Sequence, residues 1–199
     1  MKLLLIRHPR PDIAEGTCYG RTDVPAQAAH LDTVAQALRQ RWRATQGRPH
    51  QVFSSPLSRC AALARALARD AQWPEPVFDH RIAEMHFGHW EGRPWSEIPS
   101  HEMQAWRADI GRVAPPGGES LADVADRLLA FTQACLSQTL HPEAEVIVFT
   151  HVGVIQTALR VLRGEPMNGF GRTQVDFGSI STLVRRDGRF EIESIGVAP

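Results

Sequence analysis

Apolar and polar positions along the chain follow two periods, one typical of strands and one of helices. Residues 3–6 are all apolar, which is typical of a parallel strand that is covered on both faces. Two further short apolar runs, at 52–53 and 146–149, have the same character. Near the end of the chain, 180–184 and 190–195 flank an Asp-Gly turn and predict a hairpin. These segments predict a mostly parallel sheet with an antiparallel edge.

Between the predicted strands, apolar residues recur at helical spacing. Those from 31 to 42 predict a first helix, which the stretch Gly47–Pro49 should end. Those from 57 to 68 predict a second helix, for which Ser55 should be the N-cap and Pro56 the first helical residue.

Three more helices are predicted in the second half of the chain. One is expected over 100–110, inside an otherwise irregular region that is rich in tryptophan, proline and glycine. Ser120 should cap a long helix through Leu140, and a helix over 152–163 should end at Gly164. The alternation of strands and helices predicts an α/β fold, a three-layer α/β/α sandwich, built as a single domain over 1–199.

The composition narrows the class of protein. Lys and Arg together number 22, as do Asp and Glu, so the formal net charge is zero. This balance argues against binding of nucleic acid or an anionic membrane through overall charge, and neither is expected as a partner. No apolar segment approaches the length that spans a bilayer, and three widely spaced cysteines suit a reducing compartment. A cytoplasmic protein, monomer or homodimer, is therefore predicted.

Three predicted strand ends carry residues that suit an anion. His8 follows Arg7 after the first strand, Arg59 lies in the first turn of the helix after the second, and Thr150-His151 end the strand over 146–149. In an open α/β sheet, ligands bind outside the carboxyl ends of the strands. Helix N-termini favour anions, and guanidinium groups match phosphate oxygens in bidentate fashion. A phosphate group is therefore the predicted ligand.

A set of motifs, in order along nearly the whole chain, resembles those of the histidine phosphatase superfamily, which has the phosphoglycerate mutase-like fold. The motifs are LLLIRHPRP, SSPLSRC, EMHFGHWEG, GGES and FTHVGVIQ. The resemblance implies that His8 is a nucleophile that becomes phosphorylated and that Glu84 is the proton donor. It also implies that the phosphoryl oxygens are held by Arg7, Arg59 and His151, and that no metal or cofactor takes part.

The chemistry of the residues agrees with these roles. A nucleophilic imidazole must be neutral, and the like charges of Arg7, Arg59 and His151 should lower the pKa of His8. Fixed cations can stabilise the charge that spreads over the phosphoryl oxygens in the transition state. As proton donor, Glu84 would have to be protonated, a state that a neighbouring phosphate dianion and nearby aromatic residues favour.

Substrate contacts are predicted outside this set. The loop around CYGRTDVP resembles the α-ribazole phosphatase branch of the family, which implies a small phosphorylated, nucleotide-like metabolite as substrate. We expect contacts from Tyr19, Gly20, Arg21, Thr150 and Val152. Trp90 and Trp95 are expected to pack within their own loop rather than to contact substrate, although either could wall a pocket.

Two positions depart from the family's pattern. Pro9 stands where the first motif usually has glycine, which removes a backbone N–H, and Ala14 stands where an asparagine often helps to bind the phosphoryl group. Three alternatives to an α-ribazole phosphatase stay open: a broad-specificity phosphatase, a phosphoglycerate mutase and, because of Pro9 and Ala14, a catalytically inactive binder of phosphorylated ligands. A metal site built from His80, His86 and His89 is disfavoured, because their spacing matches no common zinc pattern.

Overall fold

Six strands of one sheet organise the chain. The structure is a computed structural model that describes residues 1–45, 48–71, 73–138, 141, 143–168 and 173–199. The strands pair in the order β3-β2-β4-β1-β5-β6, and the first four of these are mutually parallel. β5 runs antiparallel to β1, and β6 antiparallel to β5. Their bounds are β1 Lys2–Arg7, β2 Gln51–Ser54, β3 Val77–Phe78, β4 Glu145–Thr150, β5 Ile180–Arg186 and β6 Arg189–Val197.

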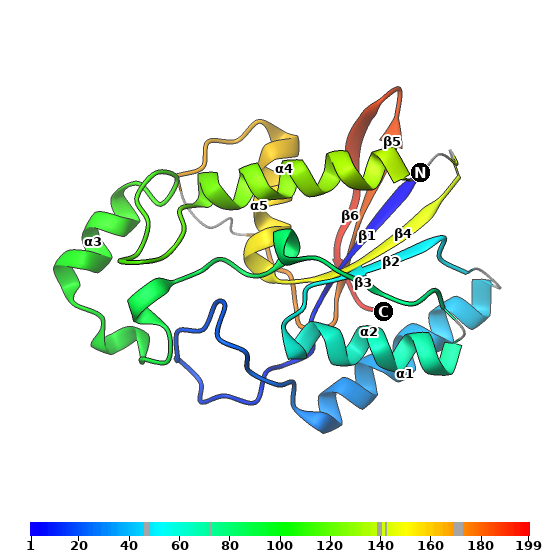
Figure 1. Ribbon diagram of the computed structural model, residues 1–199, viewed down its shortest axis with the longest axis horizontal. Helices are drawn as coiled ribbons and strands as arrows, with labels where there is room; N and C mark the ends of the chain where they lie inside the picture. Colours follow the sequence, from blue (N-terminus) through cyan, green and yellow to red (C-terminus); the bar gives the residue numbers. More distant parts are fainter. Residues whose placement is uncertain (46–47, 72, 139–140, 142, 169–172) are drawn as a thin grey trace.

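Helices cover both faces of this sheet, as Figure 1 shows with α4 and α5 above it and α1 and α2 below. Successive side chains of a strand point to opposite faces, so the apolar run of β1 serves two cores. Leu3 and Leu5 join the core under α4 and α5, whereas Leu4 and Ile6 join the core over α1 and α2. The three-layer α/β/α sandwich with an antiparallel edge is confirmed. The helices are α1 Ala28–Thr45, α2 Ser58–Ala71, α4 Leu121–Gln138 and α5 Val152–Arg163.

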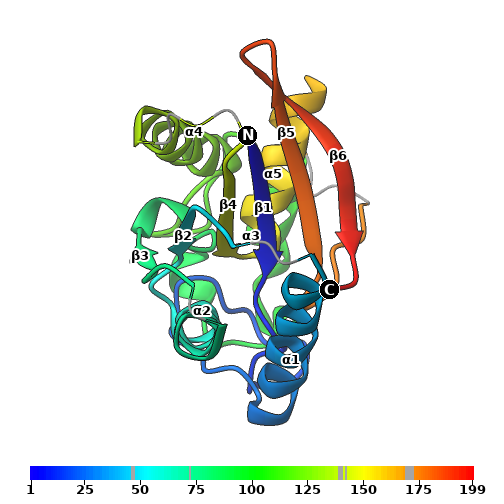
Figure 2. The same ribbon diagram turned by 90° about the vertical axis from the view of Figure 1, so that its right-hand side faces the viewer.

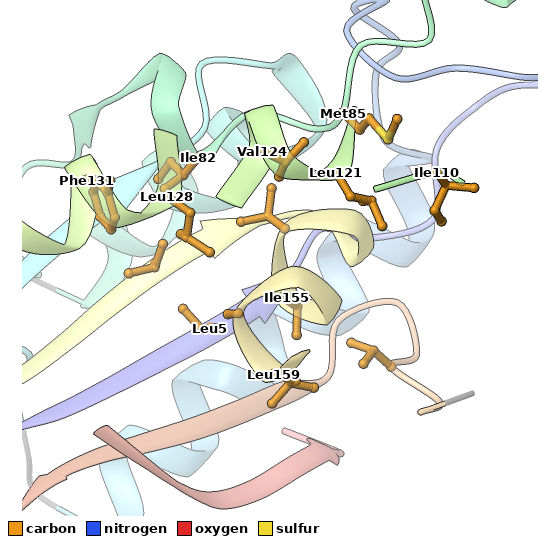
Figure 3. Close-up of a cluster of buried hydrophobic side chains, with 14 of the residues drawn as sticks. Leu5, Ile82, Met85, Ile110, Leu121, Val124, Leu128, Phe131, Ile155 and Leu159 are labelled. Carbon is orange, nitrogen blue, oxygen red and sulfur yellow. The ribbon is translucent and has the colours of Figure 1, made fainter. Parts of the chain in front are cut away.

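The larger of the two cores extends beyond the sheet. Figure 3 shows Leu121, Val124 and Leu128 of α4 packed toward Ile155 and Leu159 of α5. The same core includes Met85 and Ile110, which belong to the irregular middle of the chain. This packing anchors the irregular segment to the sheet and so determines where its polar residues lie.

Helix ends largely follow the predicted caps. The Ser120 hydroxyl accepts a hydrogen bond from Asp123 N at 3.2 Å, and the Asp123 carboxylate accepts one from Ser120 N at 2.8 Å, a reciprocal capping box. Gly164 ends α5 in the left-handed conformation, at φ 63°. The hairpin turns at Asp187 and Gly188, both with positive φ. Gly47 and Leu140, the predicted ends of two helices, lie outside the described residues.

The predicted start of α2 is wrong by two residues, since the helix begins at Ser58 and not at Pro56. Ser55 N donates to Phe149 O at 2.9 Å, which prolongs the pairing of β2 with β4 past the end of the strand. The first helical bonds go instead to the carbonyl of Leu57. The Ser55 hydroxyl still accepts a hydrogen bond from Leu57 N, at 3.3 Å, but it also faces His151.

Two irregular segments lie beyond the carboxyl ends of β1 and β4, on the left in Figure 1. The first follows β1, and the second contains three short 3₁₀ helices and one α-helix. Figure 2, turned by 90°, shows the strands with α1 and α2 below them. The expected helix over 100–110 is present but ends two residues earlier. The elements of the second segment are η1 His80–Ile82, η2 Gly88–Trp90, η3 Trp95–Glu97 and α3 Ser100–Ala108.

Two expectations from composition can be compared with the described residues. The three cysteines are buried, as expected for small core thiols. Within the described ranges, no helix combines the length and the apolar character that crossing a membrane requires.

Candidate active site

The three strand ends meet at one point. His8 follows β1, His151 follows β4, and Arg59 lies in the first turn of α2. The rings of His8 and His151 are 5.0 Å apart between centroids, and Arg59 Nε donates to His151 Nδ1 at 3.3 Å. All three side chains are almost completely buried. The predicted convergence is therefore confirmed, and it follows from the parallel pairing of β1, β4 and β2.

The surroundings of His8 favour a neutral ring with its lone pair on Nε2. Its Nδ1 lies 2.6 Å from the carbonyl oxygen of Pro9, which can only accept a hydrogen bond. The proton of a neutral imidazole therefore resides on Nδ1, and Nε2 keeps its lone pair. Burial, and next the charge of Arg59, hold the pKa of His8 well below its usual value of 6.5. The predicted direction is correct, but burial and not the like charges is the larger cause.

Arg59 and His151 form a layer behind His8. Arg59 donates from Nη2 to Gly20 O at 2.6 Å and from Nη1 to Thr22 O at 3.0 Å. Since His151 Nδ1 accepts from Arg59, its Nε2 carries the proton toward Ser55 Oγ, 2.8 Å away. Burial and the charge of Arg59 lower the pKa of His151 well below the usual value, so the ring is neutral. In this arrangement Arg59 braces the loop after β1 as well as the histidine.

Arg7 lies on the other side of His8. Its Nη1 donates to Val175 O at 2.7 Å, and its guanidinium carbon lies 3.6 Å from the ring centroid of Phe177. The charge of Arg7 also reaches Tyr19, where it opposes the rise that burial causes in the pKa of the hydroxyl group. A stacked and tethered guanidinium loses little freedom when an anion binds, so Arg7 is preorganised for phosphate.

Glu84 is held against the start of α5. Its carboxylate accepts hydrogen bonds from Met85 N at 2.9 Å and from Gly153 N at 3.2 Å. A Cβ on Gly153 would collide with Oε1 of Glu84, so only glycine at this position lets the carboxylate lie on the helix. The chain thereby brings Glu84, from a loop 76 residues after His8 in sequence, to the same cavity as His8.

A cavity of about 280 Å³ lies in front of His8. Trp95 is in its wall, whereas Trp90 is 1% exposed and packs in the core with its Nε1 donating to Glu102. The expectation of packing is thus confirmed for Trp90, and Trp95 both packs on Trp106 and walls the cavity. The lining residues are Arg7, His8, Thr17, Tyr19, Glu84, Phe87, Trp95, Val152, Gly153 and Gln156.

The predicted substrate contacts divide into two groups. Tyr19 and Val152 line the cavity. Gly20, Arg21 and Thr150 are not in the lining: Gly20 O accepts from Arg59, and the Thr150 hydroxyl donates to Ile82 O at 2.7 Å. Arg21 donates to Glu119 Oε1 at 2.7 Å. In this structure these three residues hold other parts of the site together, and their contact with substrate stays a prediction.

Sequence reasoning missed several residues of the site. Ser55 was interpreted only as a helix cap, and Phe177 lies in a segment with no recognised motif. Gln156 lies one turn after Val152 on α5, so helical spacing from the strand end could have indicated it. Thr17 and Phe87 lie in loops, where no periodic signal exists. At the two departures from the family pattern, the Pro9 carbonyl orients His8, and Ala14 is exposed to solvent.

Over the described residues, no three His, Cys, Asp or Glu side chains gather as they would around a metal ion. His86 lies instead near Glu91, with Nε2 and Oε1 separated by 3.8 Å. In the described lining of the cavity, the charged side chains are Arg7 and Glu84.

Comparison with known proteins agrees with this geometry. The sequence profile of the histidine phosphatase superfamily (branch 1) matches residues 3–198. A bifunctional protein of Mycobacterium tuberculosis is 30% identical over 188 residues, which are 90% of this chain and 49% of that protein. A glucosyl-3-phosphoglycerate phosphatase of Mycolicibacterium vanbaalenii is 29% identical over 182 residues, covering 85% and 77% of the two chains. This chain spans about half the length of the first of these relatives.

A solved structure gives the same result in three dimensions. The α-ribazole phosphatase of Shigella flexneri superposes with a TM-score of 0.85 and 25% sequence identity, covering 100% of this chain and 98% of that one. The match extends over the sheet and its loops, so the fold is the phosphoglycerate mutase-like one. The chain belongs to the histidine phosphatase superfamily, branch 1.

Proposed function

We propose that this chain is a phosphomonoester hydrolase that works through a phosphohistidine on His8. One observation carries the proposal: a neutral His8, with its proton held on Nδ1 by Pro9 O, lines the same cavity as Glu84 and Arg7. A nucleophile, an acid and a fixed cation around one cavity are the groups that a two-step phosphoryl transfer needs.

In the first step, His8 Nε2 attacks the phosphorus atom in line with the ester oxygen. The P–N bond forms, the P–O bond to the alcohol breaks, and the departing oxygen takes a proton from the Glu84 carboxyl group. Arg7, with Arg59 and His151 behind His8, stabilises the charge on the phosphoryl oxygens. In the second step water attacks the phosphohistidine, Glu84 accepts a proton from that water, and the P–N bond breaks to release phosphate.

The wall of the cavity supports a substrate with an aromatic or otherwise weakly polar leaving group. Among the described lining residues, Arg7 is the one cation, and it lies beside His8. The remainder of the wall is built mainly from Tyr19, Phe87 and Trp95, which suit a planar group. A carboxylate or second phosphate in the leaving group would lack a partner there. This favours a nucleotide-like ester, and α-ribazole 5′-phosphate is the candidate that we propose.

The same lining disfavours the mutase alternative, since phosphoglycerate carries a carboxylate next to its ester. A mutase must also return the phosphoryl group to a substrate, whereas a hydrolase releases it to water. Steady release of inorganic phosphate without added bisphosphoglycerate would distinguish a hydrolase from a mutase. Absence of turnover on every ester would instead indicate a binding protein.

The direct test is a panel of phosphomonoesters, compared by kcat/KM with the purified chain. It should include α-ribazole 5′-phosphate, p-nitrophenyl phosphate, O-phosphoserine, glucosyl-3-phosphoglycerate and 3-phosphoglycerate. Rapid quenching should trap a phosphoenzyme that is labile in acid and stable in base, as expected of phosphohistidine. Preference for the three carboxylate-bearing esters would contradict the proposed substrate class, and absence of a trapped phosphoenzyme would contradict the mechanism.

A further inference from the structure

A partly buried ion network lies directly behind Glu84. Glu119, from the GGES motif, sits between two guanidinium groups: Arg21 Nη2 donates to Oε1 at 2.7 Å, and Arg127 Nη2 donates to Oε2 at 3.2 Å. Arg127 Nε donates to Oε1 at 3.2 Å as well. The side chains of Arg127 and Glu119 are only 12% and 19% exposed. Charges so far from water are stabilised by one another and by hydrogen bonds.

Side chains of the network form hydrogen bonds with the backbone around Glu84. Arg127 Nη2 donates to the carbonyl of Glu84 at 3.2 Å, and Arg21 Nε points to the same carbonyl at 3.4 Å. Arg127 Nη1 donates to Arg81 O at 2.7 Å, and Glu119 Oε2 accepts from His86 N at 3.0 Å. Backbone groups on both sides of Glu84 are therefore fixed by side chains from α4, the GGES loop and the loop after β1.

Close backbone packing completes this support. A Cβ on Gly118 would collide with His86 O, and one on Gly88 would collide with Pro116 O. Gly118 of the GGES motif and Gly88 of the facing segment therefore let residues 115–119 lie directly on residues 86–88. Glu119 N also donates to His86 O, at 2.8 Å. The position of Glu119 relative to Glu84 is consequently set by backbone contact rather than by a flexible loop.

We infer that Arg21, Glu119 and Arg127 are positioning residues for Glu84, which hold its backbone so that its carboxyl group reaches the departing oxygen. This inference rests on the proposed function, in which Glu84 protonates the leaving group. It assigns a role to the GGES motif, whose side chains are absent from the cavity wall. It also gives Arg21 a role other than the substrate contact expected from sequence.

The inference has a consequence that a merely structural role lacks. A strongly basic alkoxide leaves only if it is protonated as the P–O bond breaks, whereas a weakly basic phenolate leaves without help. If Glu84 is displaced, hydrolysis of esters of basic alcohols should therefore become slower, whereas the hydrolysis rate of activated esters should change little. General loss of packing would slow both by the same factor.

The experiment compares three esters with rings of similar size and leaving groups of increasing basicity: p-nitrophenyl, phenyl and benzyl phosphate. The measured quantity is kcat/KM, which reports the steps up to departure of the alcohol and not the later hydrolysis of phosphohistidine. The variant is Glu119→Gln, which has nearly the same shape. Both carboxylate oxygens of Glu119 accept hydrogen bonds in the unaltered chain. The side-chain NH₂ group of the glutamine would replace one of these oxygens and could not accept the bonds donated there.

For Glu119→Gln we expect kcat/KM to fall by less than about 3-fold on p-nitrophenyl phosphate and by about 30- to 100-fold on benzyl phosphate, as for a displaced general acid. Glu84→Gln is the reference variant. Its loss of kcat/KM should also increase from p-nitrophenyl to benzyl phosphate, and should be larger than that of Glu119→Gln. Arg21→Met should show the same order with a smaller loss and an unchanged KM, since Arg21 is more exposed.

Glu193→Gln is the matched control, because it removes an equal charge from an exposed ion pair with Lys2 on β1. It should leave all three rates unchanged. Thermal unfolding and the retained rate on p-nitrophenyl phosphate show that Glu119→Gln is folded. Equal losses of Glu119→Gln on all three esters, or no loss on benzyl phosphate, would overturn the positioning role. Failure of the proposed function would appear differently, as absence of turnover in the unaltered chain on every ester, and would overturn both.

Discussion

The two ends of the cavity are built in different ways. The end around His8 consists of Arg7 and His8 at the tip of β1, and its polar groups are tied to backbone carbonyls. Arg59 and His151 lie behind His8. The other end consists of Phe87 and Trp95, which come from an irregular segment, and Tyr19 lies between the two ends with its ring 5.3 Å from the guanidinium carbon of Arg59. The first end has fixed charges and little exposed surface, whereas the second has aromatic walls. Arg7 and Glu84 are the charged side chains in the described lining of the whole cavity.

This difference indicates that the groups that react with the phosphate and the surfaces that select the rest of the substrate belong to different parts of the structure. In the proposed mechanism the sheet positions the groups that act on any phosphomonoester, because hydrogen-bonded strands hold their ends at defined spacing. The loops shape the part of the cavity that meets the rest of the substrate, and loops can change without disturbing the sheet. Changes at the His8 end should therefore affect every ester alike, and changes at the aromatic end should alter the ranking of esters.

The largest expected effect is that of His8→Ala, which removes the nucleophile. We expect kcat/KM to fall by a factor on the order of 10⁴ or more on all esters, with no phosphoenzyme trapped by rapid quenching. His101→Ala, on the exposed surface of α3, is the control and should be fully active. Residual turnover that differs between esters would show that the His8 end also selects substrate.

Arg59→Ala should have the next largest effect. Arg59 is not in the cavity lining, so in the proposed mechanism it acts as a fixed cation behind His8, and its loss should cost up to about 3 kcal/mol, or roughly 100-fold in kcat/KM. The carbonyl groups of Gly20 and Thr22 also lose their partner, so KM should rise as well. Arg65→Ala, two turns further along α2 and exposed, is the matched control. Turnover equal to that of the unaltered chain would contradict the assignment.

Trp95→Ala tests the aromatic end. Removal of the ring should lower kcat/KM for α-ribazole 5′-phosphate by about 10-fold, the value of one aromatic contact, and leave methyl phosphate nearly unchanged. Trp95→Phe should recover most of the loss. Since Trp95 also packs on Phe87 and Trp106, the melting temperature should be measured for both variants. An equal loss on the two esters would remove the distinction between the ends of the cavity.

The smallest effect concerns stability and pH. The pKa of His8 and that of His151 lie well below 6.5 in the folded protein, because of burial and the charge of Arg59. Below pH 6.5 the unfolded chain binds protons that the folded protein does not, so stability is full above that pH and falls as the pH is lowered. Each histidine contributes a slope of up to about 1.4 kcal/mol per pH unit.

Urea unfolding between pH 7.5 and 5 would measure this slope, where the chosen range brackets about one unit on each side of an ordinary histidine pKa. His8→Ala should have a shallower dependence than the unaltered chain, because one of the two histidines is gone. Equal slopes would show that His8 is not held neutral by the fold. His101→Ala serves again as the control and should keep the full slope.

The chemistry of the His8 end could be predicted from sequence because it follows regular elements. An apolar run ending in Arg7-His8, a helix start with Arg59 and a strand ending in Thr150-His151 each give a local signal, and parallel strands bring such ends together. The error at the start of α2 has a tertiary cause. Ser55 continues the pairing of β2 with β4, which a local cap signal cannot reveal.

The aromatic end and the support of Glu84 were beyond sequence reasoning. Trp90 and Trp95 are only five residues apart in one irregular segment, yet one is in the core and the other walls the cavity. Arg21, Glu119 and Arg127 are far apart along the chain, and nothing in their spacing indicates a shared network. Long-range packing of irregular segments decides both, and such segments have no periodicity from which contacts can be read.

The amino-acid sequence by itself determined the layers of the fold and the set of reactive groups, because hydrophobic periodicity and residue type are local properties. Only the tertiary structure decided which nitrogen of His8 is available, which residues brace Glu84 and which aromatic rings face a substrate. Those outcomes depend on hydrogen bonds and contacts between segments distant in the chain, and their geometry exists only once the two irregular segments pack on the end of the sheet.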